Sequence, residues 1–139
     1  MPDINKDIEL AKYRFSSAEE TLKNAKMCLD NGFYRDAINR SYYAMFYAIK
    51  AILALGSIDF KRHKDVVAYF NKEYVAGGIF PGELGRRIAR LKTKREESDY
   101  DDFFVASKDE ADAQIQTVEY ALPLIKKYLV KKTVLVENE

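Results

Sequence analysis

The most informative stretch of this chain is Arg40-Ser41-Tyr42-Tyr43-Ala44-Met45-Phe46-Tyr47-Ala48-Ile49, in which small and aromatic residues alternate with a helical period. A helix is predicted over residues 34–55, and Gly56 ends it. It carries a row of small side chains beside a row of bulky ones, which predicts a central helix with neighbours on two faces. The small row is Ala37, Ser41, Ala44, Ala48 and Ala51, and the bulky row is Ile38, Tyr42, Met45, Ile49 and Ile52.

Four further helices are predicted around this one. Apolar residues repeat at three- and four-residue steps from Ile8 to Leu29, and Asn31-Gly32 ends that first helix. The last helix opens with a Ser-x-x-Glu capping box at residues 107–110. Two shorter helices lie between, at 63–75 and 83–98, and a looser segment follows at 99–106. The pattern predicts an all-α fold, an up-and-down antiparallel bundle of four to five helices.

Composition limits the class of protein. A chain of 139 residues with 47% hydrophobic content should form one domain, residues 1–139, and we expect a flexible tail at 132–139. Its 23 basic and 22 acidic side chains nearly cancel, so nucleic acid or membrane can be attracted only by a local patch. The single cysteine forms no internal disulfide, and no apolar run reaches the roughly 20 residues of a membrane span. We therefore expect a cytoplasmic protein without a membrane partner.

The single histidine and the single cysteine exclude most imidazole and thiol chemistry. His63 opens the third helix and has no second histidine with which to form a metal site, so the favoured role is a capping or loop-anchoring imidazole. Cys28 falls beside the apolar stripe of the first helix and is expected to be a small core residue. We expect no metal ion and no cofactor.

The fourth helix has an unusual concentration of charge. Arg86, Arg87 and Arg90 lie in its first half, and Lys92 and Glu96 stand four residues apart, as in an ion pair. This pattern is typical of a solvated helix face. The alternative is a ridge that grips phosphate, because the arginine fork matches phosphate oxygens.

Arg95 differs from these residues because the helical phase directs it inward. A buried guanidinium needs an acidic partner, and Asp36 or Asp99 could supply it. Asp36 also shares one face of the central helix with Arg40, Tyr43 and Tyr47. These side chains form either a polar, aromatic cleft for a ligand or an internal hydrogen-bonded network.

The chain resembles the HEPN domain family, in its branch of small stand-alone prokaryotic proteins. The likeness covers nearly the whole chain and implies a helical bundle that often dimerises, often beside a minimal nucleotidyltransferase and often in toxin–antitoxin pairs. It rests on Tyr34-Arg35-Asp36-Ala37-Ile38-Asn39-Arg40-Ser41-Tyr42-Tyr43-Ala44-Met45-Phe46-Tyr47-Ala48, Ala51-Ile52-Leu53, His63-Lys64-Asp65-Val66-Val67 and Arg95-Glu96-Glu97-Ser98-Asp99-Tyr100.

Active HEPN ribonucleases carry an arginine and a histidine with four to six residues between them, and this motif is absent here. The positions that would hold the arginine before His63 are Gly56, Ser57 and Ile58. Where the family motif usually lies, Arg95 is followed by Asp99 and Tyr100, and aspartate at neutral pH is a poor general acid. The sequence does not decide whether the protein is an enzyme, but it favours a protein that does not cleave RNA.

The leading hypothesis is a homodimeric, degenerate HEPN protein in a toxin–antitoxin type of system. It would bind a nucleotidyltransferase partner and a nucleotide or RNA. One alternative is a metal-independent ribonuclease toxin that uses Arg95 with Asp99 or Tyr100, and another is a structural adaptor. The residues assigned to binding are Asp36, Arg40, Tyr43, Tyr47, Arg86, Arg87, Arg90, Arg95 and Tyr100.

Overall fold

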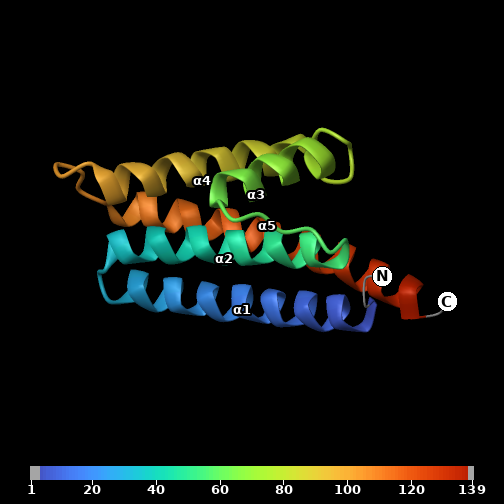
Figure 1. The fold of residues 1–139 in the computed structure, drawn as a ribbon. Helices are drawn as coiled ribbons and strands as arrows, with labels where there is room; N and C mark the ends of the chain where they lie inside the picture. Colours follow the sequence, from blue (N-terminus) through green and yellow to red (C-terminus); the bar gives the residue numbers. More distant parts are fainter. Residues whose placement is uncertain (1–3, 138–139) are drawn as a thin grey trace.

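The computed structural model describes residues 4–137, and side chains as far as residue 133. This part of the chain contains five α-helices and one π-helical turn, joined by short loops. They are α1 (Ile4–Asp30), α2 (Tyr34–Leu55), α3 (His63–Phe70), the π-helical turn η1 (Asn71–Val75), α4 (Gly82–Tyr100) and α5 (Lys108–Glu137). α1 and α2 form an antiparallel pair, and α3 and α4 lie on the opposite side of α2 from α1 (Figure 1). The all-α bundle predicted from the sequence is confirmed.

α2 is the central helix, as its two apolar faces predicted, and it packs against α1, α3, α4 and α5. The small residues of α2 are fully buried, and Ala18 and Ala25 of α1 are equally buried. Because short side chains let helix axes approach closely, this row favours tight packing of α1 on α2. The bulky row, from Ile38 to Ile52, fills the core at most 5% exposed. The residues around Tyr42 are thus held in a dense, dry environment.

The turn between α1 and α2 is closed by a Schellman motif. The Phe33 amide donates to the Cys28 carbonyl at 2.8 Å, and the Gly32 amide donates to the Leu29 carbonyl at 3.1 Å. Gly32 adopts a φ of 81°, in the left-handed region that favours glycine. The first helix therefore ends at Asn31-Gly32, as predicted, because Gly32 adopts the left-handed conformation that these hydrogen bonds require.

The structure differs from the predicted helices in three places. α4 continues through Asp99 and Tyr100, which were expected to be in a looser segment, because the Asp99 carboxylate pairs with Arg95 one turn earlier. The third helix was expected to be regular to Val75, but its last turn is the π-helical η1. α5 continues to Glu137, so most of the segment expected to be a tail is helical, and residues 138–139 lie outside the described residues.

Candidate functional site

The site is organised around Arg95, which α4 directs toward α2. Only 17% of its side chain is exposed, and its Nε lies 3.0 Å from Oδ2 of Asp99. Asp99 is one of the two acidic partners that the sequence offered. The Nε–H is not aligned for a hydrogen bond with any acceptor among the described residues, so the pair is held by charge attraction. The guanidinium therefore keeps its two Nη atoms for other contacts.

Three tyrosine rings enclose the charged end of Arg95. Its Cζ lies 4.8 Å from the centroid of the Tyr42 ring, 5.7 Å from that of Tyr43 and 6.0 Å from that of Tyr100. Nη2 also donates a long hydrogen bond of 3.4 Å to the Tyr43 hydroxyl. Aromatic faces attract cations, and the attraction strengthens as water is removed. Burial lowers the pKa of Arg95, but Tyr43, Asp99 and the other tyrosines outweigh it and hold the pKa above its usual value.

Arg40 and Tyr47 of α2 both adjoin Tyr43. The Arg40 Cζ lies 5.2 Å from the centroid of the Tyr43 ring, and Asn39 fixes this guanidinium by accepting hydrogen bonds of 2.7 and 3.3 Å. The Tyr47 ring lies 6.1 Å from the Tyr43 ring. Tyr47 also lines a groove of about 380 Å³ along α1 and α2, next to Lys50. The predicted aromatic face is therefore assembled around Tyr43.

Asp36, by contrast, is exposed in the first turn of α2. Burial and the charge of Asp36 raise the pKa of the Cys28 thiol, and the charge of Arg40 lowers it. Cys28 is half-buried and free. The acidic partner of Arg95 is Asp99, and the ion pairs found among the described residues do not join Asp36 to Arg95.

The three arginines of the fourth helix share one acid. Arg86, Arg87 and Arg90 approach the Glu83 carboxylate to 3.1, 2.9 and 3.2 Å. Hydrogen bonds from Arg87 and Arg86 lower the pKa of Glu83. The Arg87 guanidinium also lies 4.4 Å from the centroid of the Tyr120 ring on α5. These arginines form a separate ion-pair cluster at the start of α4.

His63 was expected to cap a helix or anchor a loop, but its ring packs against the aromatic residues of this site. Its ring centroid lies 4.2 Å from that of Phe46 and 5.9 Å, edge-on, from that of Tyr43. Burial lowers the pKa of His63, and the positive charges of Arg95 and Lys50 lower it further. It does begin α3, as predicted, but its partners lie on two other helices. No local sequence pattern could have shown this, because the contacts join distant segments of the chain.

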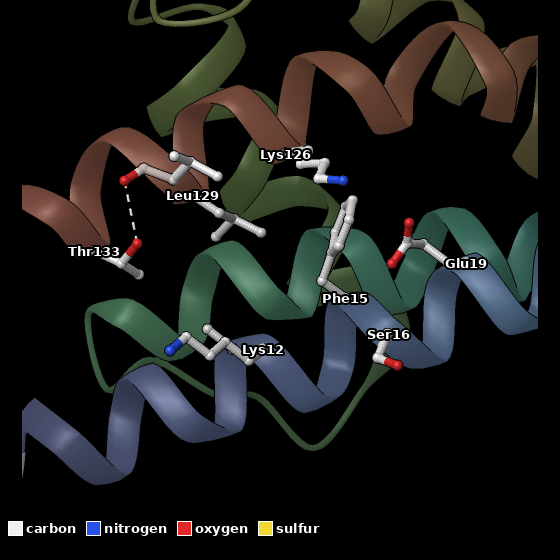
Figure 2. Close-up of a pocket in the computed structure, with 9 residues that line it drawn as sticks. Lys12, Phe15, Ser16, Glu19, Lys126, Leu129 and Thr133 are labelled. Atoms are coloured by element: carbon white, nitrogen blue, oxygen red, sulfur yellow. Dashed lines mark hydrogen bonds between the residues drawn. The ribbon is translucent and has the colours of Figure 1, made fainter.

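A second hollow lies between α1 and α5, with Phe15 and Leu129 on its walls and Lys12 and Lys126 beside them (Figure 2). Its volume is about 180 Å³, and it contains none of the predicted site residues. Within the described ranges, no three His, Cys, Asp or Glu side chains are grouped as metal ligands. No helix among the described residues has the length and apolar character to cross a membrane.

Comparison of the chain with known proteins identifies its family. The HEPN domain family matches residues 11–128. The chain belongs to the HEPN domain family. A UPF0332 protein of Thermotoga maritima is 32% identical to this HEPN chain over 126 residues, which cover 91% of the chain and 96% of that protein. A Methanocaldococcus jannaschii protein named "Putative toxin MJ0605" is 35% identical over 127 residues, 91% of this chain and 94% of its own length.

The fold of this HEPN chain also resembles a solved structure. The crystal structure of ST0689, an archaeal HEPN homologue, superposes with a TM-score of 0.69 at 18% identity, over 86% of this chain and 97% of that one. At this identity the likeness concerns the fold alone. It agrees with the order and packing of the helices described above.

Proposed function

We propose that this HEPN protein binds the phosphate groups of RNA or of a nucleotide through Arg95, and that it does not cleave them. The observation that carries the proposal is the Arg95 guanidinium, which is largely buried yet charged, and is enclosed by tyrosine rings. A guanidinium held in a fixed orientation presents paired donors that match phosphate oxygens. Arg40, beside the same Tyr43 ring, supplies a second cation.

The aromatic side chains of the site suit a nucleotide better than a bare anion. Tyr100 is 73% exposed and its ring adjoins the Arg95 guanidinium. Phe103, in the loop that follows, is 92% exposed. Exposed aromatic rings stack on bases with little regard to sequence, each contributing about 1–3 kcal/mol. The proposed ligand is therefore a single-stranded segment of RNA, or a nucleotide with the same chemistry.

The same contacts argue against cleavage. The Asp99 carboxylate is held by Arg95 at 3.0 Å, and a carboxylate engaged in an ion pair is not placed to donate a proton to a leaving group. A ribonuclease that uses Arg95 with Asp99 or Tyr100 is the alternative, and a structural adaptor without nucleic acid is the third reading.

The biological setting of the proposal is a toxin–antitoxin type of system. It is supported by the toxin name of the Methanocaldococcus jannaschii relative and by the partners that the family resemblance implies, a second copy of the chain and a minimal nucleotidyltransferase. Phe103 and Val105 are 92% and 84% exposed in the loop between α4 and α5. Apolar side chains of this exposure are typical of an interaction surface.

The test measures the fluorescence anisotropy of a short, labelled, single-stranded RNA. Arg95→Gln should weaken binding about ten- to a hundredfold, the effect of losing a charged hydrogen-bonding group. It should also reduce the salt dependence by about one phosphate contact, a slope of about 0.7 on logarithmic axes. Lys92→Gln, on the same helix and paired at 3.8 Å with Glu96, removes equal charge and serves as the control.

Arg95→Lys separates a binding effect from a folding effect, because it keeps the charge and loses the fork. Thermal unfolding of each variant shows whether the fold persists. Equal binding by the wild type and Arg95→Gln would refute the proposal, and absence of binding would favour the adaptor. Cleavage of the RNA that disappears in Arg95→Gln would establish the ribonuclease instead.

A further inference from the structure

Besides Arg40 and Arg95, the imidazole of His63 also lies against the Tyr43 ring. His63, the first residue of α3, lies edge-on to Tyr43 at 5.9 Å and against Phe46 at 4.2 Å. Arg95 reaches the same Tyr43 from α4, through the 3.4 Å bond to its hydroxyl. α2 therefore brings together an imidazole and a guanidinium that lie far apart in the sequence. The imidazole is exposed, so a ligand in solution can reach it.

The acids near His63 are already paired with other cations. Asp99 pairs with Arg95 at 3.0 Å, Asp65 with Arg62 at 3.0 Å, and Asp59 with Lys50 at 3.5 Å. The charges that act on the imidazole are those of Arg95 and Lys50, and both lower the pKa of His63. The charged and titratable groups around it are Tyr43 and Lys50 from α2, Arg95 and Asp99 from α4, Asp59, Lys61 and Arg62 from the preceding loop, and Lys64 and Asp65 from α3.

We propose that His63 is a second phosphate contact of this site, and that phosphate binding brings a proton onto its imidazole. The inference rests on the proposed function and names a contact that the sequence analysis left out. A phosphate oxygen beside both side chains would accept a hydrogen bond from Arg95 and another from the imidazolium. Its negative charge would also offset the two cations that disfavour protonation of His63.

The inference makes RNA binding depend on pH in a defined direction. In the free protein the pKa of His63 lies below its usual value of 6.5, so the imidazole is neutral at pH 7. A bound phosphodiester raises that pKa, so binding takes up a proton and tightens as the pH falls. Between the bound and the free pKa, the affinity should rise by up to about tenfold for each unit of pH.

The test follows the imidazole itself by nuclear magnetic resonance. His63 is the only histidine of the chain, so its ring proton gives one resonance whose pH titration reports this pKa directly. The probe is a short RNA without terminal phosphates, because terminal phosphates titrate with a pKa of about 6 and would confuse the curve. Addition of this RNA should raise the pKa of His63 by about one unit, the shift that a neighbouring opposite charge produces.

Three variants make the test specific. Arg95→Gln should raise the pKa of His63 in the free protein, because it removes a nearby cation, and should abolish the further rise with RNA. His63→Gln should keep binding at about pH 8, where His63 is neutral, but should lose the increase in affinity toward about pH 5.5. Lys92→Gln should behave as the wild type in both measurements.

The outcomes separate this inference from the proposed function. If RNA binds in an Arg95-dependent way and the pKa of His63 moves neither with the RNA nor with the nucleotide used next, His63 only packs on Phe46 and the inference is wrong, whereas the proposed function stands. A parallel titration uses cyclic 3′,5′-adenosine monophosphate as the nucleotide ligand, because its phosphate is a diester and does not titrate in this pH range. A rise with that nucleotide alone would support the inference for a nucleotide ligand, and no rise with either probe would overturn it. Absence of any binding would overturn the proposed function as well.

Discussion

At the scale of single residues, Tyr43 is the common contact of the site. Its ring lies near the guanidinium groups of Arg40 and Arg95 and near the imidazole of His63. Within the described part of the chain, its hydroxyl accepts one long bond, from Arg95. The ring is therefore expected to matter more than the hydroxyl, since cation–π attraction strengthens as water is excluded, whereas a hydrogen bond of 3.4 Å is weak.

A pair of substitutions tests this ranking. Tyr43→Phe keeps the ring and should change RNA affinity less than about threefold, because the hydrogen bond that it removes is long. Tyr43→Leu removes the ring and should weaken binding by about tenfold or more, the effect of losing desolvated cation–π contacts. Anisotropy titration measures both. A larger loss in Tyr43→Phe than in Tyr43→Leu would contradict the assignment of the ring as the main support.

At the scale of elements, α4 and α5 are joined through the start of α5. The Ser107 hydroxyl accepts a hydrogen bond from the Glu110 amide at 3.0 Å, and the Glu110 side chain accepts one from the Ser107 amide at 3.3 Å. Lys94 of α4 approaches the Glu110 carboxylate to 2.9 Å and the Glu97 carboxylate to 3.1 Å. The capping box predicted from Ser-x-x-Glu is confirmed, and its glutamate also holds the neighbouring helix.

Removal of the cap should destabilise the protein modestly. Ser107→Ala should lower the free energy of unfolding by about 0.5–2 kcal/mol, because the Glu110 amide loses its acceptor. Urea denaturation followed by circular dichroism measures the change. Ser107→Thr keeps the hydroxyl and is the matched control. An alanine variant as stable as the wild type would show that water replaces the cap.

Helix boundaries were harder to predict from local sequence than the helices themselves. Gly32 ends α1 because its backbone adopts a left-handed conformation, and this was readable from Asn31-Gly32. The end of α4 depends on the Arg95–Asp99 ion pair, and the sequence left either Asp36 or Asp99 as the partner of Arg95. The π-helical turn after Phe70 could not be predicted, because its apolar residues follow the same period as those of a regular α-helix.

At the scale of the whole molecule, α2 forms the centre of the core. A pair of tyrosines lies beside its C-terminal end. Tyr74 of η1 and Tyr128 of α5 pack edge to face, with their ring centroids 6.0 Å apart. Burial, followed by the neighbouring Tyr128, raises the pKa of Tyr74 to about 12 from 10.0. The folded state therefore binds the phenolic proton more tightly than the unfolded chain does.

This shift predicts a loss of stability in alkaline solution. The stabilisation is fully present below pH 10.0, the unfolded pKa, and disappears as the pH rises toward about 12, the folded pKa, because the unfolded chain ionises first. Urea unfolding across this range measures the loss, and Tyr74→Phe should reduce its slope. Tyr13→Phe, at a residue that is 71% exposed, should leave the slope unchanged. Equal slopes in all three proteins would contradict the assignment.

By itself, the sequence determined that this protein is a helical bundle with residues 34–55 at its centre. Helical periodicity and the burial of apolar faces are properties of short segments, so they can be read along the chain. Only the tertiary structure decided that Asp99 rather than Asp36 pairs with Arg95, and that His63 joins Arg95 at Tyr43. Such contacts depend on how each helix is rotated and placed against α2, and that arrangement is settled by packing of the complete core rather than by any local pattern.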